Sequence, residues 1–287
     1  MAKGVPTRGY RITKKRLANP DFVNKLTHTD FTAPVVDETD DQINERIATR
    51  FDILEKLTHA TISGDSRALI ISGPAGLGKS FSVERILKHY DPDEKSHSFI
   101  KGYVKATGLY KQLYEHREAG QVLVFDDADS IFKDDVCLNM LKAVCDTNDE
   151  RTVSYLAENN LISENGAERV PRTFKFEGSI IFITNLDFDA YVDKGHHLAA
   201  LISRAYYIDL TMKCKRDYII RIKQVVNMGM LTNLGLQSTE QKRVMDFVIE
   251  NVDRMRELSL RSVLKIGKLI KAGGDWKNIA EITCLRN

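Results

Sequence analysis

One glycine-rich segment of the sequence has residue types and spacing that suit the binding of a polyphosphate. Residues 73–80 read GPAGLGKS and fit the pattern G-x-x-x-x-G-K-[S/T]. Glycines are expected here because the backbone must curl tightly around a phosphate, and side chains would block that approach. The pattern predicts that Lys79 reaches the β- and γ-phosphates of a nucleotide and that the hydroxyl of Ser80 ligates Mg²⁺.

A pair of carboxylates supplies the second chemical signal. Asp126 and Asp127 directly follow the apolar run Val122–Phe125. In P-loop NTPases an acidic residue of this kind helps to hold Mg²⁺ beside the phosphate-binding loop. We assign that role to Asp126, and we expect Asp127 to polarise the attacking water. Asp129 is a third acid nearby, but it lies past the end of the predicted strand.

These residues require a sheet that brings several strand ends together. Five short apolar runs predict buried strands, and helical patterns separate most of them. Strands that alternate with helices indicate a parallel sheet covered on both faces. We therefore predict an α/β fold with a five-stranded parallel sheet, followed by a small all-α lid domain. The predicted strands are 68–71, 98–100, 122–125, 179–183 and 206–210, and the predicted helices include 80–89, 110–117 and 136–144.

The rest of the chain divides around this sheet. Residues 1–38 hold three prolines without helical or strand periodicity and predict a basic N-terminal tail or arm. Thr39 and Gln42 form a capping-box pattern at the start of a helix that ends near Ser63. The predicted domains are the α/β domain at 39–212, with a hairpin insertion at about 150–177, and the lid at 213–287. The insertion rests on alternation at 152–155 and 173–176, and the lid on three helical patterns at 218–226, 241–252 and 260–270.

Charge is unevenly distributed along the chain. Residues 1–25 carry a net charge of +6 and residues 213–287 a net charge of +7, so the total of +2 leaves −11 for the stretch between them. Basic ends suggest contact with an anionic partner or with the acidic centre of a neighbouring copy. A normally solvated surface is the alternative interpretation.

Composition argues against several other kinds of site. The four cysteines lack zinc-ligand spacing and are expected to be reduced thiols. The adjacent His196 and His197 are interpreted as solvated rather than metal-binding. No apolar run is long enough to cross a bilayer, and the N-terminus lacks the apolar core of a secretory signal. We therefore expect a cytoplasmic protein, or one in the host cytoplasm if a phage encodes it, with no membrane partner.

The motifs together resemble those of the AAA+ family of ring-forming ATPases, over about residues 40–270. In that family the phosphate-binding loop and the acidic strand are followed by a polar sensor at the end of the next strand. Asn185 follows the run Ser179–Thr184 and matches this sensor, whose amide holds the attacking water and touches the γ-phosphate. The brevity of the chain is similar to that of small phage or bacterial members of the family.

Two arginines extend the resemblance. The segment Leu201–Ala205 is similar to the Ser-Arg-Cys motif of clamp-loader subunits, with Ala205 in place of Cys, which implies that Arg204 acts in trans on the ATP of an adjacent subunit. The segment Leu258–Ser262 resembles the lid motif, which places Arg261 on the nucleotide of its own chain. The family uses ATP and Mg²⁺, and it implies a homo-oligomeric ring, expected to be a hexamer. The resemblance implies that the Mg²⁺ ligands are Ser80 and Asp126 and that the catalytic residues are Lys79, Asp127, Asn185 and Arg204. The implied nucleotide-binding residues are Gly73, Pro74, Ala75, Gly76, Leu77, Gly78, Lys79, Ser80, Phe81 and Arg261.

One position departs from the family pattern. The family usually has Glu where this chain has Asp127. The aspartate is one methylene shorter, so its carboxylate lies about 1.5 Å further from a water that Glu would touch, and displacements of about 1 Å can slow a reaction about a hundredfold. The sequence therefore predicts ATP binding and leaves the rate of hydrolysis open.

Residues 101–108 occupy the position that faces the central pore in AAA+ rings. Tyr103 and Val104 resemble the aromatic–aliphatic pair with which protein unfoldases grip polypeptide, but Lys105 stands where those enzymes have Gly. Lys101 and Lys105 suit a groove that follows phosphates, with Tyr103 available to stack on a base. A plain connecting loop is the remaining interpretation.

Three functions follow from these observations. The first is an ATPase that drives remodelling or loading on DNA or RNA, which the basic ends and the clamp-loader-like Ser203-Arg204 slightly favour. The second is an unfoldase-like remodeller of a partner protein. The third is a slow, ATP-gated assembly switch, for which the short carboxylate of Asp127 is the argument.

Overall fold

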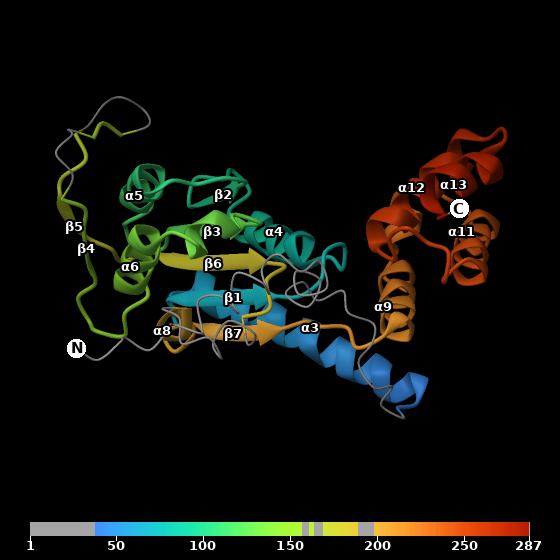
Figure 1. Cartoon of the computed structure of the whole chain (residues 1–287), viewed down its shortest axis with the longest axis horizontal. Coiled ribbons are helices and arrows are strands. Elements are labelled where there is room, and N and C mark those ends of the chain that lie inside the picture. Colours follow the sequence, from blue (N-terminus) through green and yellow to red (C-terminus); the bar gives the residue numbers. More distant parts are fainter. Residues whose placement is uncertain (1–37, 157–160, 164–168, 189–197, 287) are drawn as a thin grey trace, which may run out of the picture.

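The computed structural model describes residues 38–156, 161–163, 169–188 and 198–286 (Figure 1). The predicted basic arm therefore lies almost wholly outside the described residues, as do His196, His197 and parts of the predicted insertion. No described helix has the length and apolar character needed to cross a membrane.

A parallel sheet of five strands forms the centre of the molecule, as the apolar runs predict. Its order is β2-β3-β6-β1-β7, so strands that are distant in sequence are neighbours in space (Figure 1). The central strands are buried along their whole length, which is why they read as continuous apolar runs rather than as alternating patterns. The bounds are β1 Ala68–Ser72, β2 His97–Lys101, β3 Val122–Asp126, β6 Ser179–Thr184 and β7 Tyr206–Asp209.

The register aligns the carboxyl ends of these strands along one edge of the sheet. Ser72 at the end of β1 lies opposite Thr184 at the end of β6. Asp126 at the end of β3 lies opposite Ile183 on one side and opposite Lys101 of β2 on the other. The chain segments that follow these strands therefore emerge side by side, and this edge positions the candidate site.

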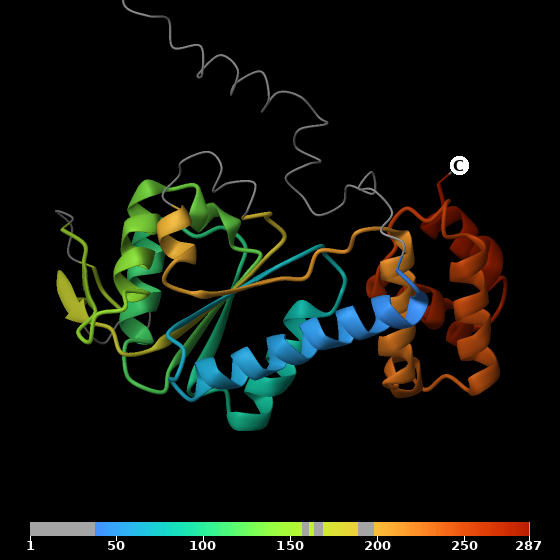
Figure 2. The ribbon, with the colours of Figure 1, turned by 90° about the horizontal axis from the view of Figure 1, so that it is seen from below.

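Helices cover both faces of the sheet. The long helix α3 (Asp40–Ile62) and α4 (Lys79–Tyr90) lie on one face, whereas α5 (Ala106–Glu115), α6 (Asp135–Val144) and α8 (Leu198–Ile202) lie on the other (Figures 1 and 2). Successive strand residues point to opposite faces, so Leu69 and Ile71 join the core under α3 while Ile70 joins the core under α5 and α6. A short 3₁₀ helix, η1 (Asp129–Phe132), follows β3.

The predicted capping box and hairpin are both confirmed. The Thr39 hydroxyl accepts a hydrogen bond from the Gln42 backbone N–H, and the Gln42 side chain accepts one from the Thr39 N–H, at the start of α3. The strands β4 (Thr152–Ser154) and β5 (Thr173–Lys175) pair antiparallel. The hairpin packs on α5 through ring contacts of Tyr110 with Phe174 at 5.0 Å between centroids.

Five described helices follow β7 where the sequence predicts three. The additional elements are the single turn α10 (Met230–Asn233) and the helix α13 (Trp276–Cys284). α13 follows the Gly273-Gly274 pair, beyond the last predicted helical pattern. It is held by the burial of Ala280 and Cys284 and by the contact of the Trp276 ring with Phe247. The other three are α9 (Lys215–Asn227), α11 (Ser238–Glu250) and α12 (Leu260–Ala272), and α9 packs against α3.

Candidate functional site

The glycine-rich segment connects β1 to α4 at the carboxyl edge of the sheet. Gly73, Gly76 and Gly78 all have positive φ, at 151°, 75° and 92°. A Cβ on Gly73 would lie 2.9 Å from the Leu210 Cβ, and a Cβ on Gly76 would lie 2.5 Å from the Ser259 Cβ. Glycine is therefore required by the backbone conformation and by the close approach of neighbouring segments, as the phosphate-binding pattern predicts.

The ammonium group of Lys79 lies inside the curl of this loop. It donates hydrogen bonds to the backbone carbonyls of Gly73 and Pro74, the latter at 2.9 Å, and to the Asn185 Oδ1, also at 2.9 Å. Only 5% of Lys79 is exposed, and burial lowers its pKa to about 8. The carboxylates of Asp127 and Asp126 oppose this shift without cancelling it.

Two oxygen groups meet where the sequence places the metal. The Ser80 hydroxyl donates a hydrogen bond of 2.7 Å to Asp126 Oδ1. Asp126 is buried, so its carboxylate is held in one orientation at the end of β3. A hydroxyl and a carboxylate are hard oxygen ligands, and Mg²⁺ in nucleotide sites takes one or two such protein ligands together with phosphate oxygens. The residues present therefore fit a nucleotide-bound Mg²⁺.

Lys101, which the sequence associates with a groove that follows phosphates, also contacts this part of the site. It is the last residue of β2, and its Nζ lies 3.1 Å from Asp126 Oδ2. The pairing follows from the sheet, because Lys101 and Asp126 are register partners on adjacent strands. Both oxygens of Asp126 are thus engaged, one by Ser80 and one by Lys101.

Asp127 and Asn185 lie next to the lysine. The Asn185 Nδ2 donates a hydrogen bond of 2.8 Å to Asp127 Oδ1, while its Oδ1 accepts from Lys79. Asp127 has a left-handed backbone with φ of 55°, and its N–H donates to the carbonyl of Ile183 at 2.9 Å. Aspartate tolerates this conformation better than most residues. The turn directs the Asp127 side chain to the sheet edge, where water can reach it.

Asp129 has a supporting position that the sequence does not reveal. Its Oδ1 accepts a hydrogen bond of 2.6 Å from the Thr184 hydroxyl, at the residue before Asn185. Burial raises the pKa of Asp129 above its ordinary value. This bond ties the segment after β3 to the end of β6, so Asp127 and Asn185 are held in register.

The helices that follow β7 reach the glycine-rich loop directly. The Leu260 N–H, at the first residue of α12, donates to the Gly76 carbonyl at 2.9 Å. Arg261 is the next residue, and its positive charge acts together with burial to lower the pKa of Lys79. Arg261 is thus near the loop, whereas Phe81, the residue after Ser80, is largely exposed.

A further arginine of the lid supports the loop from behind. Arg221 of α9 is buried, donates from Nε to the Leu77 carbonyl at 3.4 Å, and stacks on the Phe51 ring of α3 at 3.3 Å. Burial lowers its pKa to about 10. Nothing in the sequence distinguishes Arg221 from the other basic residues of an amphipathic helix, so this contact is visible only in the fold.

Arg204 lies at the opposite edge of the sheet, where the parallel strands begin. It precedes β7, which runs parallel to β1 with Tyr206 opposite Leu69. Its Nη1 donates to the Ala200 carbonyl at 2.8 Å, and its Nε lies 3.8 Å from Asp146 Oδ1. The structure therefore separates Arg204 from the phosphate-binding loop of its own chain.

The loop that carries Tyr103 is shorter than predicted. Helix α5 begins at Ala106 rather than at 110, so only residues 102–105 connect it to β2. The Tyr103 side chain is 78% exposed, and Lys105 is exposed as well. The Val104 N–H donates to the Ser130 hydroxyl of η1 at 3.0 Å, which links this loop to the segment that follows β3.

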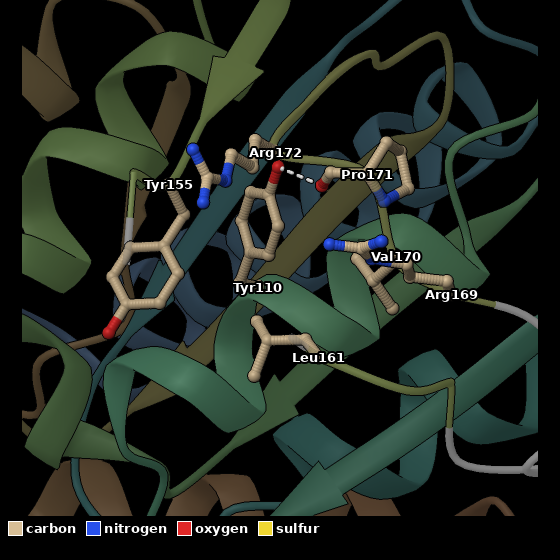
Figure 3. A pocket seen from close by; sticks show the side chains of 7 residues that line it. All are labelled: Tyr110, Tyr155, Leu161, Arg169, Val170, Pro171 and Arg172. Carbon is tan, nitrogen blue, oxygen red and sulfur yellow. Dashed lines mark hydrogen bonds between the residues drawn. The ribbon is translucent and has the colours of Figure 1, made fainter. Parts of the chain in front are cut away.

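A pocket at the hairpin lies away from this site. It has a volume of about 160 Å³, and the Tyr110 hydroxyl at its wall donates to the Pro171 carbonyl at 2.9 Å (Figure 3). Small-molecule sites usually occupy about 300–1,000 Å³, so the pocket is too small for a nucleotide. Its lining residues are Tyr110, Tyr155, Leu161, Arg169, Val170, Pro171 and Arg172.

Comparison with known proteins by sequence finds a relative of this chain in a bacteriophage. It is the uncharacterised 36.7 kDa protein of the nrdC-mobD intergenic region of Enterobacteria phage T4, which is 36% identical over 252 residues. The match covers 85% of this chain and 76% of the phage T4 protein. No protein-family model matches the sequence.

Solved structures that are similar to this chain include NtrX and RuvB. NtrX from Brucella abortus in complex with ATP is 13% identical with a TM-score of 0.46, covering 94% of this chain and 61% of NtrX. The chain thus spans less than two thirds of that structure. RuvB from Thermotoga maritima, a Holliday junction branch migration motor, is 14% identical with a TM-score of 0.44, covering 83% of this chain and 68% of RuvB.

Proposed function

We propose that this chain, which belongs to the family of the uncharacterised phage T4 protein, binds and hydrolyses ATP with Mg²⁺. Its strand order and the order of its motifs are those of an AAA+ P-loop ATPase. The observation that carries the proposal is the hydrogen-bonded row Lys79–Asn185–Asp127 beside the Ser80–Asp126 pair. These five side chains come from the ends of β3 and β6 and from the start of α4, and they converge on one loop.

In this proposal the loop binds the phosphates through its backbone N–H groups and through the Lys79 ammonium. Ser80 and Asp126 would hold the Mg²⁺, which would supply neutralisation of charge on the phosphate oxygens when bound. The α12 contact between Leu260 and Gly76 places Arg261 where its charge adds to that of Lys79. Nucleotide binding would thus involve both the α/β region and the lid.

Hydrolysis requires a positioned water, which we assign to Asp127 and Asn185. The amide of Asn185 donates to one oxygen of Asp127 and leaves the second oxygen available to accept a proton or to orient a water. The Asp127 carboxylate is short, so the expected turnover is slow unless the water lies closer than in relatives with Glu. A slow, ATP-gated assembly switch is therefore a second candidate function.

Arg204 would act on the ATP of another copy. Five residues of β1 at about 3.3 Å each separate the two edges of the sheet by about 15 Å, which exceeds the reach of an arginine side chain. We therefore propose a homo-oligomeric ring, expected to be hexameric, in which Arg204 offsets charge that develops during phosphoryl transfer.

The four free cysteines suit a reducing cytoplasm.

The ATPase is proposed to act on DNA or RNA. The lid region carries net +7, and exposed Tyr103 and Lys105 lie together on one short loop. The exposed Tyr103 also supports the protein-remodelling alternative. The deciding experiment measures the ATPase rate with single-stranded DNA, duplex DNA, RNA and a denatured protein. Stimulation by the denatured protein alone would exclude a nucleic-acid substrate, and absence of ATP turnover under all conditions would contradict the enzyme.

A further inference from the structure

Three arginines share a small surface at the end of the lid. Met255 and Leu285 form an isolated antiparallel bridge between the segment before α12 and the segment after α13. The Arg256 N–H donates to the Cys284 carbonyl at 2.8 Å, and the Arg286 N–H donates to the Arg254 carbonyl at 2.7 Å. We call Arg254, Arg256 and Arg286 the arginine face.

The bridge explains why the three arginines lie close together at the surface. Met255 and Leu285 are 5% and 1% exposed, so this pair faces the core of the lid. The residues flanking the pair, Arg254, Arg256 and Arg286, are all exposed. The pairing of the two segments therefore gathers three exposed arginines in one small part of the surface.

This charge has no acidic partner among the described residues. Other basic groups of the lid do: Lys213 pairs with Glu38, and Arg216 pairs with Asp40. Asp253, although next to Arg254 in sequence, pairs with Lys215 at 2.9 Å.

The acid that adjoins Arg256 in the sequence is directed elsewhere. Glu257 follows Arg256 in sequence, and its carboxylate lies against Gly76 of the phosphate-binding loop. Within the arginine face, Arg286 Nη2 donates a hydrogen bond to the Arg256 carbonyl at 3.5 Å. Like charges directly opposite each other on paired segments, as at Arg254 and Arg286, repel, and a bound anion would offset this repulsion.

We propose that the arginine face binds the phosphate backbone of a nucleic acid. Arginine suits this role because its planar guanidinium stays charged and matches phosphate oxygens with two parallel donors. The role of this surface in an ATP-driven reaction rests on the proposed ATPase function. Binding of nucleic acid by the surface does not, since it is measurable without ATP.

The position of the face also connects it with the nucleotide site. Only three residues separate Arg256 from Leu260, whose N–H bonds to the Gly76 carbonyl. A strand held by the face would therefore be linked through a short segment to the phosphate-binding loop. This arrangement predicts that nucleic acid bound here changes the rate of ATP turnover.

The test compares two triple variants that remove the same charge. The first is Arg254→Gln, Arg256→Gln and Arg286→Gln. The matched control is Lys242→Gln, Arg243→Gln and Lys268→Gln, which replaces exposed basic residues elsewhere on the lid. Binding to labelled single-stranded and duplex DNA is measured by fluorescence anisotropy over a series of salt concentrations. Thermal unfolding and ATPase without DNA verify that both variants are folded.

We expect the first variant to bind DNA about tenfold or more weakly. Its slope of log Kd against log salt should fall by about 2 for single-stranded DNA and about 3 for duplex DNA. The control should stay within about twofold of the unaltered chain. Equal weakening of both variants would show that net charge alone matters and would overturn the proposal.

Two further outcomes separate this inference from the proposed function. No DNA or RNA binding by the unaltered chain would overturn the arginine face and the nucleic-acid substrate but would leave ATP hydrolysis standing. Binding of the face to an acidic polypeptide in place of nucleic acid would likewise overturn it. Loss of DNA binding in the first variant, in a chain that never hydrolyses ATP, would support the face and contradict the ATPase.

Discussion

The Asn185 side chain donates a hydrogen bond of 2.8 Å from Nδ2 to Asp127 Oδ1, across the ends of two adjacent strands. The same amide accepts a hydrogen bond from Lys79. The residue that would orient the water and the residue that would bind the phosphates are therefore joined by a single side chain. A substitution of one of these three residues is therefore expected to alter the positions of the other two.

This relationship predicts non-additive kinetics for Asp127→Asn and Asn185→Ala. Each single variant should lower kcat about a hundredfold while the affinity for ATP stays within about threefold, because both residues act on the water. The double variant should be hardly slower than either single variant, since the two residues work as one unit. A loss of kcat in the double variant equal to the product of the two single losses, measured in steady-state assays, would contradict this coupling.

Replacement of Lys79 by Ala should weaken ATP binding by about tenfold to a hundredfold, because it removes a buried, charge-assisted contact to phosphate. Lys88→Ala is a suitable control, since Lys88 lies on the same helix but pairs with Glu84 on the surface. Binding is measured with a fluorescent ATP analogue. Unchanged binding in Lys79→Ala would contradict the assignment of the loop.

The depressed pKa of Lys79 predicts that ATP affinity depends on pH. Burial holds this pKa at about 8, against an ordinary value of 10.5. The phosphates bind the ammonium form, so affinity should fall as pH rises above about 8. The unfolded chain binds more protons than the folded chain between these two values, so the contribution of Lys79 to stability rises with pH across that window. Kd is measured from pH 7 to 9.5, and a flat profile would contradict the prediction.

The permanently charged variant Lys79→Arg provides the control for that profile. Its guanidinium does not lose a proton in this range. Any residual binding by Lys79→Arg should therefore be independent of pH. A parallel fall in both proteins would assign the titration to another group.

Lys101→Met should increase the affinity for the metal by about twofold to fivefold. The Lys101 ammonium lies 3.1 Å from Asp126 Oδ2 and competes with a divalent cation for that oxygen, although the exposure of Lys101 limits the effect. Mn²⁺ binding in the presence of a non-hydrolysable ATP analogue is measured by electron paramagnetic resonance. Lys105→Met is the control, because Lys105 lies on the loop that follows β2 and pairs with no metal-site residue among those that the structure describes. Weaker Mn²⁺ binding in Lys101→Met would contradict competition.

Arg204→Ala should preserve ATP binding but stop turnover, because Arg204 lies at the sheet edge opposite the loop. Mixing Arg204→Ala subunits with Asp127→Asn subunits should restore part of the activity, since some interfaces then combine an intact arginine with an intact carboxylate. The rate is measured as the mixing ratio varies. No recovery at any ratio would argue against action in trans.

The sequence by itself determined the parts of the site that are contiguous in the chain. Residues 73–80 form one turn between a strand and a helix, so the glycines, Lys79 and Ser80 are read from a single pattern. The buried strands are apolar throughout, which identifies β3 and hence Asp126 at its end. Local chemistry and burial both act within a few residues, so they leave a signal in the sequence.

Tertiary structure alone decided which distant groups meet. Arg221 supports Leu77 across 144 positions of the chain, and Lys101 faces Asp126 because sheet order makes β2 and β3 neighbours. The arginine face exists because the chain returns after α13 to pair Leu285 with Met255. Such contacts depend on the packing of whole elements, and the residues themselves look like ordinary surface charges in the sequence.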